Sequence, residues 1–302
     1  MFSIVTAILP VFLLIFLGSW LEGRGFPGSG FWQPAERLTY RIFFPALIVT
    51  TLSGADLAGL SVLPMAGALV AAILLMAGGM MAVQRLWGVD GPAFTSMIQG
   101  AVRMNVYICL SIAAAVWGSA GLTVAAIAIA VIVPTVNLIC VIALARWGSA
   151  AEPTVLGTIK QVATNPLIIA AVLGALSNFT GMPIVVGDML DILGRAALPI
   201  GLLCVGAALN WPAVRRNARA VAQTTALKLV AMPALTAVML WAFGVEGLTA
   251  AIALLFMASP TATSSYILAR QLGGDATLMA GVITLQTAVS MVSLPVILTI
   301  AG

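Results

Sequence analysis

The sequence predicts an all-α membrane protein of ten transmembrane helices, arranged as two inverted repeats of five helices each. Three observations lead to this prediction. Hydrophobic residues make up 62% of the 302-residue chain and charged residues only 7%, whereas soluble domains carry roughly 25% charged residues. Ten apolar segments reach the length of a membrane span, about 20 residues. Prolines, glycines and tyrosines also recur at a nearly constant distance along the chain.

Each predicted span is an apolar run bounded by glycine, proline or a charged residue. The ten runs cover residues 1–21, 34–53, 61–85, 92–117, 119–145, 164–180, 189–210, 217–242, 246–270 and 275–300. The first run has no basic residues before it and no small-residue cleavage site. We therefore expect it to be the first span and not a removable signal peptide.

Basic residues lie on one side of this predicted topology. The loops after the even-numbered spans hold no Lys or Arg, and instead carry Asp56, Asp188, Asp191 and Glu246. The loops and helix ends after the odd-numbered spans hold Arg24, Arg37, Arg41, Arg85, Arg146, Lys160, Arg215, Arg216, Arg219 and Arg270. Because Lys and Arg concentrate in cytoplasmic loops, both termini are expected on the non-cytoplasmic side. This asymmetry explains the net charge of +4 without a nucleic-acid partner.

Marker residues of the first half recur in the second half. Pro10 and Gly18 in the first span correspond to Pro166 and Gly174 in the sixth, both 156 positions later. Further pairs are Pro45 with Pro199, Tyr107 with Tyr266, and Pro134 with Pro295, at offsets of 154, 159 and 161. Five spans per half place the second copy upside down in the membrane, as in many secondary transporters. The predicted halves are residues 1–146 and 164–302, joined by a cytoplasmic linker at 147–163.

Two of the predicted spans interrupt their own apolar pattern. In the ninth span, Pro260 lies among Ser259, Thr261, Thr263, Ser264 and Ser265. Pro260 lacks a backbone donor and clashes with the carbonyl of Phe256, so the helix must kink or open there. Secondary carriers build substrate sites from such breaks, although a kinked helix whose hydroxyls bond its own backbone fits the pattern equally. The matching fourth span carries Gln99, Gly100, Arg103, Asn105 and Ser111.

Three cations fall within predicted spans. Arg103 lies near the midplane, where a charge costs about 2.5–3.5 kcal/mol and indicates a functional site by default. Its alternative roles are capping of helix carbonyls and snorkelling. Lys228 is open to a functional role or to partial snorkelling toward the cytoplasm. Arg195 is expected to form an i,i+4 ion pair with Asp191.

Several function classes are disfavoured by what the spans lack. Histidine is absent, and no Asp or Glu lies at a span centre, so proton coupling through a side chain is not supported. Cys109, Cys140 and Cys204 show no ligand spacing, so neither a metal nor a disulfide is expected. An enzyme is not expected either, because it would need a convergent acid, base or metal set, and the nearest candidates, Asp188 and Asp191, lack other partners. Unpaired cations in the core favour an anionic substrate, and broken-helix N-termini add to the positive field.

Five short segments carry a resemblance that extends over essentially the whole chain. They are Arg103-Met-Asn105, Asn165-Pro-Leu-Ile-Ile169, Leu198-Pro-Ile-Gly201 and on to Gly206, Ser259-Pro-Thr261, and Tyr266 to Asp275. With these segments in this order, the chain resembles the auxin efflux carrier family, in the bacterial branch that includes malonate and malate permeases. The resemblance implies the ten-helix fold shared with bile acid–sodium symporters, in the inner membrane of a bacterium.

The resemblance also implies a mechanism. Broken helices 4 and 9 cross at the midplane, helices 1, 2, 6 and 7 form a scaffold that dimerises, and helices 3–5 and 8–10 form a transport domain that moves as an elevator. The substrate-binding asparagine of the family falls on Asn105 and the crossover proline on Pro260. The glycine and proline that usually follow the asparagine are absent here. The break in helix 4 is therefore expected to be milder, or to lie at Gly100.

Together these features predict a secondary transporter of a small mono- or dicarboxylate, embedded in the bilayer as a homodimer and requiring no cofactor. The predicted substrate-binding residues are Asn105, Arg103, Tyr107, Pro260, Thr261, Ser264, Ser265, Tyr266 and Lys228. A sodium-coupled symporter remains an alternative, because hydroxyls and unwound carbonyls can bind sodium. A membrane receptor without transport activity is the other alternative.

Overall fold

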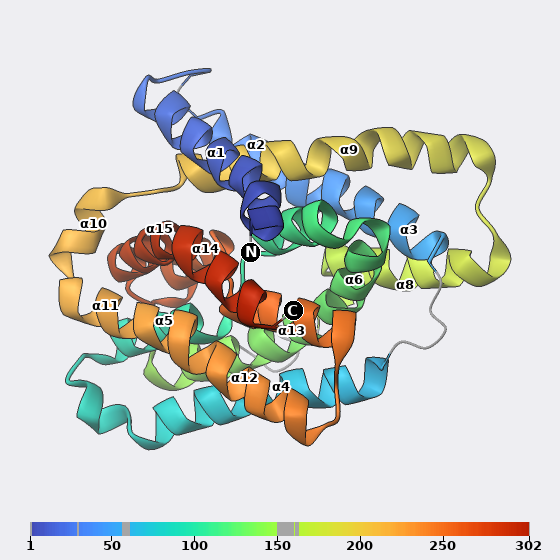
Figure 1. Ribbon diagram of the computed structural model, residues 1–302. Helices are drawn as coiled ribbons and strands as arrows, with labels where there is room; N and C mark the ends of the chain where they lie inside the picture. Colours follow the sequence, from blue (N-terminus) through green and yellow to red (C-terminus); the bar gives the residue numbers. More distant parts are fainter. Residues whose placement is uncertain (1, 29, 56–60, 150–159, 161–162, 302) are drawn as a thin grey trace. The chain divides into compact units, whose positions relative to one another are not determined.

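The computed structural model describes residues 2–28, 30–55, 61–149, 160 and 163–301. All regular secondary structure in these ranges is helical, and they contain no strand (Figure 1). Helices long and apolar enough to cross a membrane are Ile4–Gly23, Val62–Ala82, Gly91–Trp147, Ile184–Ala207, Ala218–Ala242 and Ala276–Ile300. The prediction of an all-α, multi-pass membrane protein is confirmed at this level. The count of ten spans and their inverted repeat stay predictions.

Some helix boundaries differ from the predicted ones. Helix α6 (Val106–Trp147) runs through two predicted spans, but Gly118 inside it has φ 58° and ψ −141°. This left-handed φ, which glycine adopts without steric cost, lies where the predicted spans 92–117 and 119–145 meet. Helix α9 (Ile184–Ala207) begins five residues before the predicted start of its span, directly after Pro183. A short helix that the sequence did not predict, α10 (Trp211–Arg216), is capped by the side chain of Asn210.

Contacts group the chain into two compact units, and each unit draws on both halves of the sequence. The first comprises Met1–Leu60, Tyr107–Ala130 and Gln161–Ala208; the second comprises Ser61–Val106, Val131–Lys160 and Leu209–Gly302. Most of the predicted linker at 147–163 lies outside the described residues, as does Asp56. The predicted division into two halves with a linker therefore stays a prediction.

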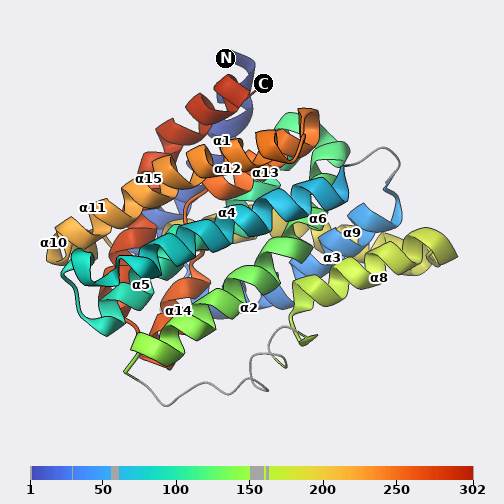
Figure 2. The ribbon, with the colours of Figure 1, turned by 90° about the horizontal axis from the view of Figure 1, so that it is seen from below.

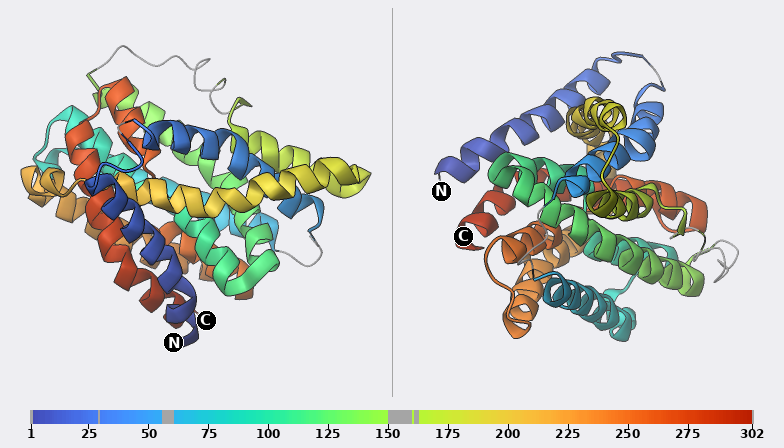
Figure 3. Two further views of the ribbon diagram at one scale, coloured as in Figure 1. Left: turned by 90° about the horizontal axis from the view of Figure 1, so that it is seen from above. Right: turned by 90° about the vertical axis from the view of Figure 1, so that its right-hand side faces the viewer.

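The first unit is built from α1 (Phe2–Gly23), α9 and two shorter helical rods. One rod joins α2 (Trp32–Leu38), a π-helical turn η1 (Thr39–Phe43) and α3 (Phe44–Ser53), and the other is α8 (Pro166–Thr180). Helix α1 packs along α9, and α3 packs against both α8 and α9 (Figure 3). At the end of α3, the side-chain amide of Asn178 donates to the carbonyls of Leu52, Ser53 and Ala55. These bonds satisfy carbonyls that a helix end leaves without partners.

Two glycines set the close packing of α1 on α9. A Cβ atom added to Gly206 would overlap the backbone carbonyl of Ile15, and one added to Gly18 would overlap the carbonyl of Leu203. Small residues that let backbones approach closely are the common device for packing helices in membranes. The close packing of α1 on α9 therefore requires glycine, which has no side chain, at positions 18 and 206.

The substitution Gly206→Ala is expected to destabilise the protein by about 1–3 kcal/mol, because the backbones of α1 and α9 must separate. The matched control is Gly78→Ala within α4 (Val62–Ala82), where an added Cβ meets no atom within 4 Å. That control should leave stability unchanged or raise it by up to about 1 kcal/mol, through helix propensity. Thermal unfolding of both variants in one detergent measures the difference. Equal midpoints for the two variants would contradict this account of the packing.

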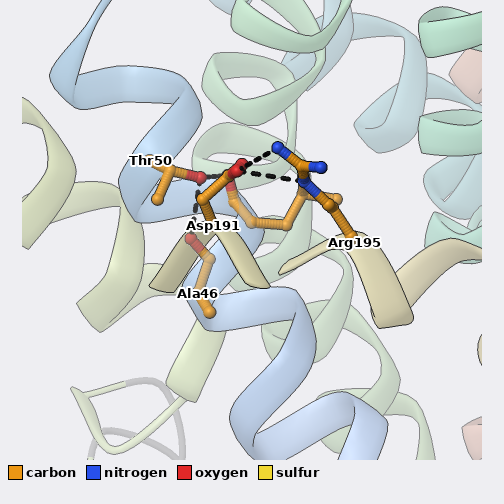
Figure 4. Close-up of polar contacts among 5 residues, drawn as sticks. Ala46, Thr50, Asp191 and Arg195 are labelled. Carbon is orange, nitrogen blue, oxygen red and sulfur yellow. Dashed lines mark hydrogen bonds and ion pairs between the residues drawn. The ribbon is translucent and has the colours of Figure 1, made fainter. Parts of the chain in front are cut away.

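The predicted ion pair on α9 is confirmed. The Arg195 guanidinium lies 2.6 Å from the Asp191 carboxylate, one helical turn away, and both side chains are exposed. Figure 4 shows this pair beside α3, where the Thr50 hydroxyl donates to the carbonyl of Ala46. An exposed pair of this spacing is worth only about 0.3–0.5 kcal/mol. Because Asp191 neutralises the charge of Arg195, no substrate is needed to explain a cation at this position.

The second unit surrounds α15 (Ala276–Ala301), which contacts α10, α11 (Ala218–Ala226), α13 (Gly247–Ala258) and α14 (Ser264–Leu272). It also contacts α5 (Gly91–Val102), where Gly100 faces Thr224 of α11 and Val282 of α15. Helix α12 (Met232–Ala242) packs along α4 at the edge of this unit (Figure 2). A short 3₁₀ helix, η2 (Gln84–Trp87), follows α4. Helix α15 thus lies where the interrupted helices of this unit meet.

Two π-helical turns lie just before prolines inside helical rods. The turn η1 ends two residues before Pro45, and η3 (Leu227–Ala231) ends two residues before Pro233. Proline cannot donate to the carbonyl four residues earlier and clashes with it. A π turn widens the helix at that place, so each rod continues past its proline. Lys228 lies inside the second of these turns.

Candidate functional site

Two helices of the second unit end abruptly in the middle of apolar sequence. Helix α5 ends at Val102 and α6 begins at Val106, which leaves Arg103, Met104 and Asn105 outside regular structure. Helix α13 ends at Ala258 and α14 begins at Ser264. Gly100, the expected alternative position of the first break, lies inside α5. Neither glycine nor proline therefore makes the interruption at Arg103.

The second interruption is explained by Pro260. Because proline has no N–H, it cannot bond to the carbonyl of Phe256, four residues before it. The hydroxyl of Ser259 donates to that carbonyl instead, at 2.8 Å. The helix opens, and one of its hydroxyls also bonds back to the helix's own backbone. The predicted bonding of a hydroxyl to the helix's own backbone is thus confirmed, and the use of this break as a substrate site stays a prediction.

The two interruptions have the same geometry. Helices α5 and α13 are both 12 residues long, and they begin at Gly91 and Gly247, 156 positions apart. The residues that follow them, Arg103 and Ser259, have nearly equal backbone angles of φ −75° and ψ 158°, and φ −72° and ψ 153°. The backbone N–H of Asn105 donates to the carbonyl of Pro260 at 2.7 Å. The two interruptions, at residues 103–105 and 259–263, are therefore joined by a backbone hydrogen bond. The second of them is called the opening after α13 below.

Arg103 lies at this junction with neutral partners. Its guanidinium donates to the side-chain oxygen of Asn137 at 3.0 Å and, over a longer 3.4 Å, to the hydroxyl of Ser264. Its Nε is buried and has no hydrogen-bond partner among the described residues. No carboxylate of the described chain forms an ion pair with Arg103. The junction therefore holds a positive charge that no carboxylate of the described residues balances.

A second polar group fixes the backbone of the opening after α13. The N–H of Thr261 donates to the side-chain oxygen of Gln286 on α15 at 2.8 Å, and its hydroxyl lies 3.3 Å from the carbonyl of Gln99 and 3.4 Å from the hydroxyl of Ser265. The amide nitrogen of Gln286 donates to the carbonyls of Gly100 at 3.0 Å and Thr224 at 3.3 Å. One glutamine thus joins α5, α11, α15 and the opening.

The structure adds three residues that the sequence did not assign to the site: Asn137, Gln286 and the side chain of Gln99. Gln99 is fully buried, and both polar atoms of its amide lack partners among the described residues. Each of the three has an amide side chain within an otherwise apolar helix. An isolated amide of this kind is the sequence signal that could have identified them. A buried amide without a partner is costly, so Gln99 is a candidate to face a bound molecule.

The remaining predicted site residues lie in different surroundings. Lys228 is fully buried, so its side chain does not reach the surface as snorkelling would require. Tyr107 belongs to the first unit, where its ring stacks on Phe44 at 4.7 Å between centroids. Tyr266 belongs to the second unit and lines a cavity of about 280 Å³ with Arg216 of α10. Within the described residues, no three His, Cys, Asp or Glu side chains come close enough to hold a metal ion.

Apolar membrane-length helices with a polar, positively charged interruption are features that secondary transporters use to build their substrate sites. Residues 154–298, just under half of the chain, match the family described as membrane transport protein. An uncharacterized transporter of the archaeon Methanothermobacter thermautotrophicus is 26% identical over 296 residues, which cover 95% of each chain. These matches confirm the resemblance to the auxin efflux carrier family. They support a membrane transporter, and neither names a substrate.

Proposed function

We propose that this protein is a secondary transporter of small organic anions, and that it binds one carboxylate of its substrate at Arg103. The observation that carries the proposal is the pairing of Arg103 with the neutral groups of Asn137 and Ser264, without a carboxylate. An unbalanced charge within membrane-spanning helices is costly. An anionic substrate balances it and gains charge-assisted hydrogen bonds in return.

The ends of the helices at the junction add to the positive field. Helix α6 begins directly after Asn105, and α14 begins at Ser264. Helix N-termini carry partial positive charge and exposed N–H groups that suit anions. In this proposal Arg103, Asn105 and Ser264 contact the substrate. Thr261 and Ser265, whose hydroxyls lie beside each other and the carbonyl of Gln99, fix the shape of the opening.

The proposed movement is an elevator-type alternation, and the grouping of contacts supports it. The first unit contains the predicted helices 1, 2, 6 and 7, which the family uses as scaffold, and also Tyr107–Ala130 from the predicted helices 4 and 5. The second contains the predicted helices 3, 8, 9 and 10 together with Arg103 and Asn105. Each unit has its own internal contacts, which is what two bodies moving as wholes require. Dimerisation through the scaffold is part of the same proposal.

Coupling to an ion is the point on which two candidate functions differ. The described residues offer no buried carboxylate at the junction, which favours transport driven by the substrate gradient and membrane potential. A sodium-coupled symporter is the second candidate, because the carbonyl of Gln99 and the hydroxyls of Thr261 and Ser265 lie together. Oxygen atoms of this kind are the ligands that hard cations prefer.

The proposal is tested by uptake into proteoliposomes of labelled malonate, malate and indole-3-acetate. Sodium, pH and membrane potential are varied separately. We expect saturable uptake of at least one acid that follows the potential and needs neither sodium nor a pH gradient. Uptake that requires sodium would select the symporter instead. No uptake of any acid by a folded protein would overturn the proposal and favour a receptor.

A further inference from the structure

A groove of about 540 Å³ lies on the first unit, between α3, α8 and α9. Its lining positions on α8 follow helical spacing: Pro166, Ile169, Ala170, Leu173 and Ser177. Similar stripes of α3 and α9 form the other walls, and the groove reaches Gly181 just beyond the end of α8. A helix of 15 residues is roughly 22 Å long at 1.5 Å per residue. The groove therefore extends along the length of α8 and has a mostly apolar lining.

The dimensions of the groove suit an extended hydrocarbon chain better than a compact solute. The hydrocarbon core of a bilayer is about 30 Å thick, so each leaflet contributes chains over about 15 Å. A groove that follows the whole of α8 accommodates such a chain along its length. Its lining includes exposed apolar residues such as Ile169 and Leu173, as expected of a surface in contact with lipid.

One end of the groove carries Arg41, the one charged side chain among the described residues that line it. This side chain is exposed, and it forms no hydrogen bond or ion pair with another described residue. Arg41 lies in the π turn η1 beside Pro45, which also lines the groove. By the distribution of basic residues, this end faces the cytoplasmic leaflet. Anionic lipids of that leaflet attract basic residues near the membrane surface.

We propose that this groove binds an anionic phospholipid of the bilayer, with its phosphate at Arg41 and one acyl chain along α8. The acyl chain alone gives little preference for the groove over the bilayer, because lipid tails are as apolar as the groove. Discrimination between lipids must therefore come from the headgroup and Arg41. One basic residue near the surface predicts a preference of about fivefold for an anionic over a zwitterionic headgroup. This inference concerns the first unit and does not depend on the substrate.

The test uses the full chain in vesicles of equal parts phosphatidylglycerol and phosphatidylcholine, with retained lipids counted by native mass spectrometry. We expect phosphatidylglycerol to be retained about fivefold over phosphatidylcholine. Arg41→Gln should remove this preference. Arg37→Gln should preserve it, because Arg37 is exposed on α2 but does not line the groove.

A second pair of variants tests the groove itself. Ser177→Phe places a ring in the groove and should lower the total retained lipid, whereas Val185→Phe, at an 80% exposed position outside the lining, should not. Equal retention of the two lipids by the wild-type protein would overturn the proposal. So would a preference that survives Arg41→Gln. A lipid-free dimer that Ser177→Phe dissociates would also overturn it and assign the groove to a second copy of the chain.

Discussion

Replacing Arg103 by alanine is expected to weaken binding and transport of the substrate anion by about 10- to 100-fold. A hydrogen bond to a charged group contributes about 1.5–3 kcal/mol, and the variant also removes the positive charge that attracts the anion. Arg103→Lys should fall between the wild type and alanine, because lysine keeps the charge but cannot form the planar, forked contact. Initial rates of uptake at varied substrate concentration measure the effect.

The thermal stability of the Arg103→Ala variant distinguishes a role of Arg103 in substrate binding from a role in holding the fold together. If Arg103 serves to bind substrate, its removal relieves a charge that costs about 2.5–3.5 kcal/mol at mid-membrane. The loss of the bond to Asn137 offsets part of this gain. Arg103→Ala should therefore unfold at the same temperature as the wild type or higher. A large fall in the midpoint with transport retained per folded molecule would identify Arg103 as a helix cap. Arg270→Ala, at an exposed position near the end of α14, is the control for loss of a cation.

The substitution Gln286→Leu is expected to lower stability by about 2–4 kcal/mol, since buried partners left unsatisfied cost about 1–3 kcal/mol each. The N–H of Thr261 and the carbonyls of Gly100 and Thr224 all lose a partner. Leucine has a similar size, so packing at this fully buried position changes little. Thermal unfolding in detergent measures the loss.

The exposed Gln271 near the end of α14 provides the matched control. Gln271→Leu removes an amide of the same kind without leaving a buried group unsatisfied, and should leave the midpoint unchanged. Equal midpoints for Gln286→Leu and Gln271→Leu would show that the opening after α13 does not depend on Gln286. A stable Gln286→Leu variant with lost transport would instead indicate that Gln286 contacts the substrate.

Composition and local chemistry were sufficient to predict the membrane class and the weak points of two helices. Pro260 predicted an opening because its missing donor acts within one helical turn, and the structure ends α13 two residues before it. The pair of Asp191 and Arg195 was predictable for the same reason. Both features depend only on residues that are close in sequence.

The remaining parts of the site depend on contacts between distant segments. Asn137 and Gln286 each stand alone in an apolar helix, so neither forms a pattern that indicates its partner. Arg103 meets Asn137 across 34 positions, and Gln286 meets Gly100 across 186. The fold also assigns Tyr107 and Tyr266 to different units, although the sequence predicted both as substrate-binding residues. The two tyrosines occupy corresponding positions in the predicted repeats, but this correspondence does not indicate the unit to which each belongs.

The central claim is that the substrate anion binds where the two interrupted helices meet. Ala262 lies in the opening after α13, is partly buried and has no assigned polar role. The native thiols of Cys109, Cys140 and Cys204 are buried, so Ala262→Cys adds one accessible site for a small thiol reagent. Gln271→Cys, at an exposed position, reports labelling that substrate should not affect.

Alkylation of Ala262→Cys is measured with and without the transported acid, and with its uncharged diamide for comparison. The account predicts that the acid slows labelling at this position, that the diamide does not, and that Gln271→Cys reacts equally in all three conditions. A variant that still transports the acid, yet is labelled at the same rate with and without it, would contradict binding at this junction.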